Sequence, residues 1–112
     1  KTVLLAPARI YFDVAKVDLP PDASALLKPI VDFLIANSQA GVDVSGYVDK
    51  TGDPIKNAEL AKNRAKAVRD MLMSSGVSEA QINMKKPEIL TGAGSDMEAR
   101  RVEVSIASGK GV

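Results

Sequence analysis

The chain has 112 residues and a formal net charge of +1, and this length suits one compact domain with a modest hydrophobic core. Apolar residues make up 46% and charged residues 26%, which is an ordinary globular balance and argues against a disordered chain. Because the sequence contains no histidine and no cysteine, metal sites of the His/Cys type, thiol nucleophiles and histidine-based triads are excluded, while a carboxylate site for a hard cation stays open.

The first two expected elements are a strand and a helix. Residues 8–14, ARIYFDV, alternate apolar and polar side chains, which is the pattern of a half-buried strand. Residues 25–41 predict a helix with Gly41 as its stop. Its apolar stripe has a spacing of three and four and consists of Leu27, Ile30, Val31 and Leu34. Pro29 lies inside this stretch, so the helix either kinks one turn before it or begins later than Asp22.

A second strand and a second helix follow. Residues 42–48, VDVSGYV, keep their valines in phase around a central glycine, as a strand requires. Asp53 followed by Pro54 is a strong helix start, because the carboxylate can accept free N–H groups and proline lacks an N–H that would be unpaired there. The helix is expected to run to about Ser75, with Gly76 as the residue after its end.

The remaining segments complete a sheet. A short helical turn is expected at residues 78–82, a weaker third strand at 87–92 and a cleanly alternating strand at 100–107. The order β-α-β-α-β-β predicts an α/β (α+β) fold. In this two-layer sandwich, two main helices pack on one face of a mixed sheet.

One charge lies on the apolar side of the second helix. On a helical wheel of about 100° per residue, Arg64 lies roughly 40° from Val68, the centre of the apolar sector. Every other charge between residues 56 and 70 lies at least about 100° away. Three interpretations of Arg64 are open. It reaches along the stripe edge to water, it forms a structural ion pair with Asp49 or Asp13, or its guanidinium binds a ligand carboxylate or phosphate at a cleft.

Asp49 favours the ligand interpretation, because it ends the second strand just before the next helix. The carboxyl end of a strand beside a helix start is a common ligand position in open sheets. An acid and an arginine there could recognise a zwitterion, the acid binding an ammonium and the arginine a carboxylate. The helix from Pro54 to Arg64 spans about 15 Å. The arginine side chain reaches back toward the helix start, which shortens this gap without closing it.

The segment GYVDKTGDPIKNAELAKNRAKAVRDML, residues 46–72, resembles the core of the OmpA-like C-terminal domain. This peptidoglycan-binding module is also found in peptidoglycan-associated lipoprotein and flagellar MotB. The family pattern is a strand ending in His-Thr-Asp, a turn with glycine, and then Asn-x-x-Leu-Ser-x-x-Arg-Ala. The matching positions here are Asp49, Gly52, Asn57, Leu60, Ala61, Arg64 and Ala65. The segments IYFDV and ARRVEVSI resemble the opening and closing strands of the family.

The resemblance implies a single OmpA-like domain over residues 1–112, with its core at about 8–107, that docks the peptide stem of peptidoglycan. In the family, the acid and the arginine that match Asp49 and Arg64 hold diaminopimelate, which carries an amino group and a carboxylate on one carbon. The other ligand-binding candidates are Thr51, Gly52, Asn57 and Leu60. The possible supporting residues are Phe12, Asp13, Arg100 and Arg101.

The sequence also departs from the family pattern. Residues 47–48 are Tyr-Val in place of His-Thr, Ala61 replaces the serine, and the loop TGAGSDMEARR is short. These changes point to a trimmed, weaker or altered site. Asn57 is equally explained as a hydrogen-bonding residue of the helix. For Arg100 and Arg101, a solvated or sheet-edge pair is favoured over ligand contacts.

Four functions are open to a domain of this kind. A non-catalytic cell-wall anchor comes first, and a protein-interaction module that has lost the ligand on the same fold comes second. A nucleic-acid binder is disfavoured, because the chain has no basic excess and no exposed aromatic pair on a strand. An enzyme is disfavoured because no second catalytic partner converges with any of the acids. We expect peptidoglycan as the partner, no cofactor and no metal, and leave a homodimer open.

The family resemblance places the domain in the periplasm, within the cell envelope of a diderm bacterium. No stretch approaches the roughly 20 apolar residues that a membrane span needs. We therefore expect membrane attachment, to the outer or the inner membrane, only through an anchor outside this chain. Such an anchor would be a signal peptide with a lipobox, or a single span, upstream of Lys1.

Overall fold

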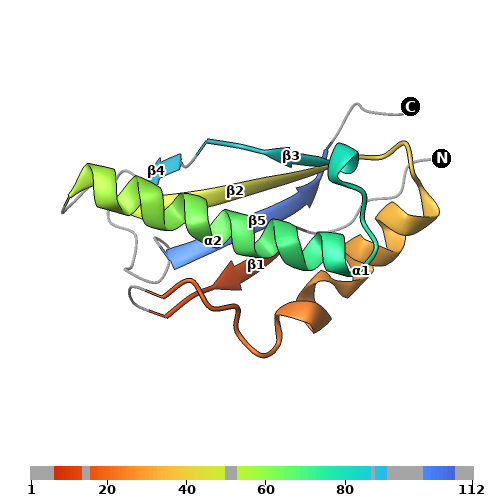
Figure 1. The fold of residues 1–112 in the computed structure, drawn as a ribbon, viewed down its shortest axis with the longest axis horizontal. Coiled ribbons are helices and arrows are strands. Elements are labelled where there is room, and N and C mark those ends of the chain that lie inside the picture. Colours follow the sequence, from red (N-terminus) through yellow and green to blue (C-terminus); the bar gives the residue numbers. More distant parts are fainter. Residues whose placement is uncertain (1–6, 14–15, 50–52, 87, 91–99, 108–112) are drawn as a thin grey trace.

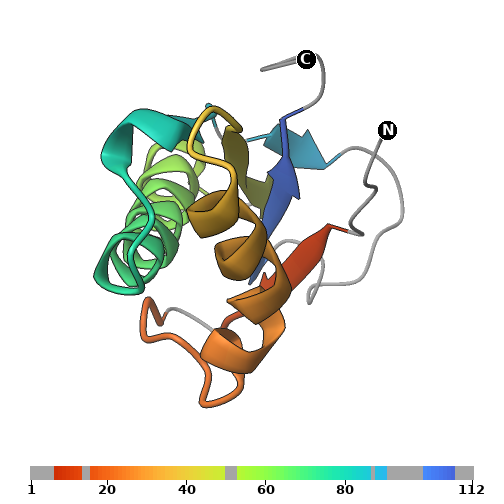
Figure 2. The same cartoon turned by 90° about the vertical axis from the view of Figure 1, so that its right-hand side faces the viewer.

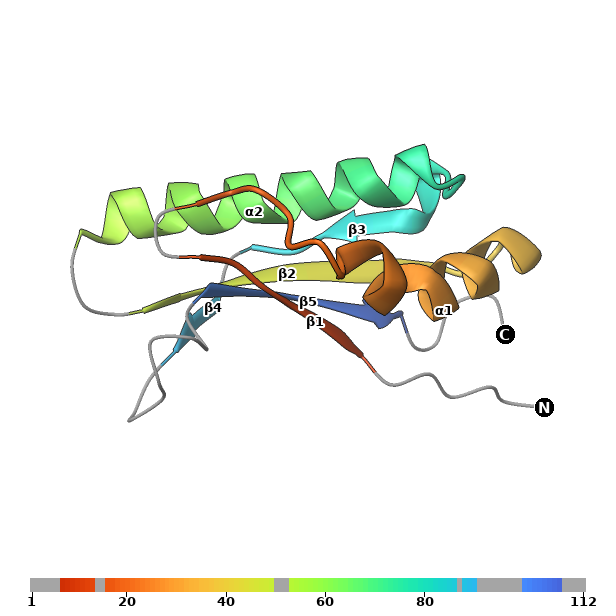
Figure 3. The same cartoon turned by 90° about the horizontal axis from the view of Figure 1, so that it is seen from below.

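The computed structural model describes residues 7–13, 16–49, 53–86, 88–90 and 100–107, which form two layers (Figure 1). One layer is a sheet, and the other consists of two helices over one face of that sheet (Figures 2 and 3). The elements are β1 (Ala8–Tyr11), α1 (Ala23–Ala36), β2 (Val42–Asp49), α2 (Pro54–Ser74), the 3-10 turn η1 (Glu79–Gln81), β3 (Ile82–Met84), β4 (Glu88–Leu90) and β5 (Arg101–Ile106). The predicted α/β two-layer fold is confirmed.

The sheet is mixed, with strand order β1-β5-β2-β3, and β4 also pairs with β2. β5 is antiparallel to both neighbours, whereas β3 and β4 run parallel to β2. β3 pairs with residues 42–44 and β4 with residues 47–49. Between these two paired stretches, β2 has two residues, 45 and 46. The segment that connects β3 to β4 along the edge of the sheet has three residues, 85–87. The edge of the sheet is therefore interrupted and carries one residue more than β2.

β3 is an addition to the predicted order of strands. It has three residues, INM, which are too few to show an alternation. The weaker strand expected at residues 87–92 corresponds to β4 at 88–90. β1 ends at Tyr11, earlier than the predicted residue 14, although the backbone N–H of Phe12 still donates to the carbonyl of Arg100 (2.8 Å).

Apolar side chains fill the space between the sheet and the helices. The sheet contributes Ile10, Val42, Val44, Val102 and Val104, each 0% exposed. The helices contribute Leu27, Ile30 and Leu34 from α1 and Ala65, Val68 and Leu72 from α2. Burial of one large apolar side chain contributes about 1.5–3 kcal/mol. The alternation and the helical spacing in the sequence thus identified the core.

The end of α1 differs from the prediction. The helix begins one residue after Asp22 and continues through the exposed Pro29. It ends before Asn37, not at Gly41. The backbone and side-chain N–H groups of Asn37 both donate to the carbonyl of Phe33, at 2.9 and 2.8 Å. Asn37 therefore satisfies the helix end four residues before the glycine.

Both ends of α2 are capped as the sequence predicts. The carboxylate of Asp53 accepts hydrogen bonds from the backbone N–H groups of the second and third helical residues, at 2.9 and 3.3 Å. At the other end Gly76 has φ 111°, a conformation that favours glycine. The N–H of Val77 donates to the carbonyl of Leu72 (3.0 Å), which closes the last turn.

Gly46 sets the distance between β2 and α2. A Cβ atom at this position would lie 2.8 Å from the carbonyl oxygen of Ala61 and 3.1 Å from its Cβ. The helix backbone therefore touches the strand at a residue that has no side chain. The small Ala61, which replaces the serine of the family pattern, is itself buried in this contact.

Gly46→Ala should lower the free energy of unfolding by about 1–3 kcal/mol, because the added methyl group must push α2 away from β2. Urea denaturation measures the change. The matched control is Ser45→Ala, on the neighbouring half-buried residue, which should stay within about 0.5 kcal/mol of the parent. Equal stability of the two variants would contradict the close contact.

Candidate functional site

Three strands place candidate residues at one end of the sheet. β1 ends at Tyr11, which pairs with Arg101 at the start of β5. The next residue of β5, Val102, lies opposite Gly46, and β2 ends three residues later at Asp49. We call the group at this end the strand-end site. It comprises Phe12, Asp13, Asp49, Arg64 and Arg100.

Arg64 is buried, with 2% of its surface exposed. Its Nε donates to the carbonyl of Lys16 (2.8 Å) and its Nη2 donates to the carbonyl of Asp13 (3.0 Å). Its guanidinium carbon lies 5.4 Å from the centre of the Phe12 ring, within the range of a cation–π contact. The interpretation of Arg64 as a side chain that reaches water is therefore wrong. The guanidinium instead ties α2 to the loop that follows β1.

The charge of Arg64 has no carboxylate beside it in the part of the chain whose side chains are described. The ion pairs there are Arg9–Glu103, Lys28–Asp32 and Arg69–Asp70. An ion pair with Asp13 is wrong, because Asp13 is exposed and contacts Arg64 through its backbone carbonyl. Burial, and then repulsion from Arg100, lower the pKa of Arg64 from its ordinary value. A buried cation that has another cation close by and no described carboxylate beside it is stabilised by a negative charge that approaches it.

Arg100 belongs to the strand-end site and braces it. Its Nε donates to the carbonyl of Phe12 (2.9 Å), and the N–H of Phe12 donates to the carbonyl of Arg100 (2.8 Å). This exchange extends the β1–β5 pairing by one residue. It also keeps a second cation close enough to Arg64 to affect its pKa.

Arg101 does not join Arg64, because successive strand residues point to opposite faces of a sheet. Its guanidinium carbon lies 4.1 Å from the centre of the Tyr47 ring. The Tyr47 hydroxyl donates to Oε1 of Glu103 (3.1 Å), and Oε2 of Glu103 accepts from Nε of Arg9 (3.0 Å). These residues form a polar group on the sheet face that the helices leave open.

The other candidates are only partly placed. Asn57 and Leu60 are half-buried on α2, and Asn57 precedes Arg64 by seven residues, about two turns, on the same side of the helix. Thr51 and Gly52 lie outside the described residues, as does the side chain of Asp49.

The separation of Asp49 from Arg64 follows from the contact between Gly46 and Ala61. β2 and α2 run in opposite directions (Figure 1). Asp49 lies about 10 Å beyond Gly46 along the strand. Arg64 lies about 4.5 Å beyond Ala61 in the other direction. Their Cα atoms are therefore about 15 Å apart along the helix, a gap that the arginine side chain and a small ligand together can span.

A cavity of about 360 Å³ adjoins the loop that Arg64 holds. Its lining includes Tyr11, Asp13, Lys16, Asp18 and Leu19. Acids and a lysine together suit a ligand that carries both signs of charge. The sequence did not single out Lys16 or Asp18, because neither lies in a periodic element or a motif.

The sequence pattern of the OmpA family matches residues 11–104. The chain belongs to the OmpA family. A peptidoglycan-associated lipoprotein from Pseudomonas aeruginosa is 33% identical over 110 residues, which cover 93% of this chain and 65% of that protein. The crystal structure of the peptidoglycan-associated lipoprotein from Burkholderia pseudomallei has a TM-score of 0.74 and 26% identity, covering 89% of this chain and 90% of that chain.

The OmpA-like domain of FopA1 from Francisella tularensis has a TM-score of 0.75 and 28% identity, covering 88% of this chain and 70% of that chain. This OmpA-family chain spans 39% of a peptidoglycan-associated lipoprotein from Rhizobium meliloti and 65% of the one from Pseudomonas. Like other OmpA-like domains it is a non-enzymatic structural or binding module. Among the helices that the structure describes, none is both long enough and apolar enough to cross a bilayer.

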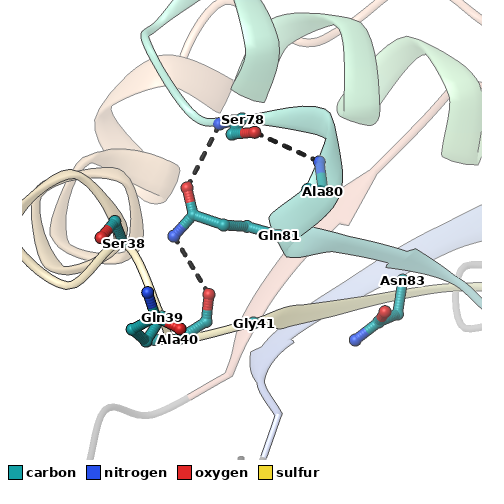
Figure 4. Close-up of a pocket in the computed structure, with 8 residues that line it drawn as sticks. All are labelled: Ser38, Gln39, Ala40, Gly41, Ser78, Ala80, Gln81 and Asn83. Carbon is teal, nitrogen blue, oxygen red and sulfur yellow. Dashed lines mark hydrogen bonds between the residues drawn. The ribbon is translucent and has the colours of Figure 1, made fainter. Parts of the chain in front are cut away.

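A second cavity of this OmpA-family domain, about 440 Å³, has a structural explanation (Figure 4). Its described lining carries no charge, and its main polar group is the buried amide of Gln81. The two N–H groups on Nε2 of Gln81 donate to the carbonyls of Leu34 (3.0 Å), Asn37 (3.1 Å) and Ala40 (3.0 Å), so one N–H is shared between two of these carbonyls. Its Oε1 accepts from the N–H of Ser78 (3.2 Å). The amide thus joins the end of α1 to η1.

Arg64→Ala should lower the free energy of unfolding by at least about 2 kcal/mol, because two loop carbonyls each lose a buried donor. Arg64→Lys should fall between this variant and the parent, since an ammonium cannot reproduce the geometry of two separate donors. Urea denaturation measures both. The control is Lys62→Ala, on an exposed residue of the same helix. A loss no larger than that of the control would show that the loop does not depend on Arg64.

Gln81→Met keeps the size of the side chain and removes its polar atoms. It should lower the free energy of unfolding by about 1–3 kcal/mol, because buried carbonyls at the end of α1 lose their donor. Thermal and urea melts measure the loss. Gln39→Met, on an exposed residue near the same cavity, should change little, and an equal effect of the two variants would contradict this role.

Proposed function

We propose that this chain is a non-catalytic module that binds peptidoglycan, with the strand-end site holding the diaminopimelate of the stem peptide. Membership of the OmpA family and the similarity to peptidoglycan-associated lipoproteins support the proposal. The observation that carries it is the buried guanidinium of Arg64, which lies beside Arg100 and has no described carboxylate partner. A ligand carboxylate would supply the missing negative charge.

The geometry limits how Arg64 can hold such a ligand. The edge formed by Nε and Nη2 already donates to Asp13 and Lys16. The two parallel bonds expected for a ligand cannot use this edge, so the ligand contacts the Nη1 end of the guanidinium. A charge-assisted hydrogen bond there contributes about 1.5–3 kcal/mol. Asp49 binds the ammonium group of the same residue, while Thr51, Gly52, Asn57 and Leu60 flank the peptide.

The proposal also includes a cellular location for the domain. Its relatives include a peptidoglycan-associated lipoprotein, an outer membrane porin and the periplasmic domain of MotB. This chain would therefore act on the periplasmic side of the cell envelope, as part of a longer protein that an anchor outside this chain attaches to a membrane. Peptidoglycan binding would then hold that protein to the cell wall.

A second function has its own support. At three positions where the family pattern has polar groups, the side chains of this chain instead contribute to its fold. Val48 is 7% exposed, Ala61 packs against Gly46, and the Tyr47 hydroxyl bonds to Glu103. A domain without the stem-peptide ligand, working as a protein-interaction module, would fit these changes.

Asp49→Asn should lower the affinity for a diaminopimelate-containing stem peptide about tenfold to a hundredfold, because a charge-assisted bond to the ammonium is lost. Its melting temperature should stay within a few degrees of the parent. Arg64→Lys should lower the affinity comparably, and Arg69→Ala, on the other side of α2, should bind like the parent. Calorimetric titration at fixed salt, with thermal melts alongside, measures these effects.

Sedimentation with purified sacculi separates the two functions. A folded parent domain that leaves sacculi unbound would support the interaction module and rule out the anchor. If sacculi bind but Asp49→Asn binds equally well, the ligand lies elsewhere on the domain. A stem peptide with lysine in place of diaminopimelate, titrated in parallel, tests the choice of ligand.

A further inference from the structure

A groove on the far side of α2 concentrates positive charge. It encloses about 410 Å³ and is lined by Gly46, Lys62, Ala65, Lys66, Arg69, Met84, Lys85 and Lys86. We call it the basic groove. Its helical cations lie about 100–160° from Val68 on the wheel, whereas Arg64 lies about 40° away in the opposite direction. The buried stripe of α2 therefore separates the basic groove from the strand-end site.

The interruption of the sheet edge forms the floor of this groove. Gly46 lies between the stretches of β2 that pair with β3 and with β4. Lys85 and Lys86 directly follow β3 and line the groove together with residues of α2. The floor is apolar, since it consists of Gly46, the buried Ala65 and the partly exposed Met84.

The described side chains that line the groove carry charge of one sign. Of the eight lining residues that the structure describes, five are cations and none is an acid, although the whole chain has a net charge of only +1. Four of the five are exposed lysines. The fifth, Arg69, already donates from Nε and Nη2 to Asp70 at 3.2 and 3.1 Å. The lysines are therefore the groups that remain for a ligand.

The spacing of the charges indicates the shape of the ligand. Lys62, Lys66 and Arg69 extend over about 10 Å along one wall, and Lys85 and Lys86 form the other wall. A single phosphate would need donors that converge on one point. Charges spread along two walls suit several carboxylates in a row, and an apolar floor between them suits an apolar side chain.

We propose that the basic groove binds an extended acidic peptide segment of a partner protein, with its carboxylates on the lysines and an apolar side chain against Met84. The net charge of +1 provides no wide attractive field for a bilayer or a nucleic acid. Binding here goes beyond peptidoglycan recognition and uses none of the residues of the strand-end site.

The probe for the test is a fluorescent peptide of alternating glutamate and valine, titrated by anisotropy at about 0.1 M salt, where screening acts over about 10 Å. The parent should bind it saturably, and Lys62→Glu with Lys66→Glu should bind at least tenfold more weakly. The control reverses two exposed lysines elsewhere, Lys28→Glu with Lys56→Glu, and has the same net charge. It should bind like the parent, and an equal loss in both variants would overturn the proposal.

Further arms test the chemistry of the ligand. Met84→Gln should weaken binding of the glutamate–valine peptide and leave a glutamate–serine peptide unaffected. Tighter binding of polyphosphate or of phosphatidylglycerol vesicles than of the peptide would overturn the proposal, as would the absence of saturable peptide binding, which indicates lysines that serve solubility alone. Asp49→Asn should keep peptide binding and the Lys62/Lys66 variant should keep sacculus binding, so the two proposals fail independently.

Discussion

The hold of a buried guanidinium on two loop carbonyls is the interaction on which this domain depends. Arg64 joins the centre of α2 to Asp13 and Lys16 in the loop after β1. Arg100 then fixes Phe12 from the side of β5. Helix, loop and two strands therefore meet around one positive charge. The same contacts that keep the loop in place also keep the charge away from water. In this environment of low dielectric constant the charge attracts an anion more strongly than it would in water.

Features that depend on a few neighbouring residues could be predicted from the sequence. Contacts between segments that are distant in the sequence could not. Asp53 and Gly76 predicted both ends of α2, because caps are local. The position of Arg64 among apolar residues was readable from the helical wheel. Its partners were not, since they are backbone carbonyls 48 and 51 residues away in a loop without periodicity. The alternation of side chains along a strand predicts that Arg100 and Arg101 point to opposite faces of the sheet. In the sequence the two arginines nevertheless look like one pair.

The two sides of α2 show how solvent decides what a cation can do. On one side a single arginine is almost fully buried, so its interactions are strong, few and fixed in direction. On the other side several lysines are exposed, so each contributes little alone and salt weakens them together. Both arrangements lie beside the same apolar stripe of α2. Small residues in this stripe, such as Ala61 and Ala65, let the helix backbone approach the sheet.

The interrupted edge of the sheet has a consequence for self-association. A strand from a second copy that continued the sheet would have to pair with β3 and β4 in one register. β3 and β4 have only three residues each, and their pairing with β2 is interrupted between them, so an added strand would find two short stretches of ladder in place of one long edge. This edge of the sheet, opposite the β1 edge, is therefore a poor template for growth into a continuous intermolecular sheet. An uninterrupted edge strand of the same length would have been a template for aggregation.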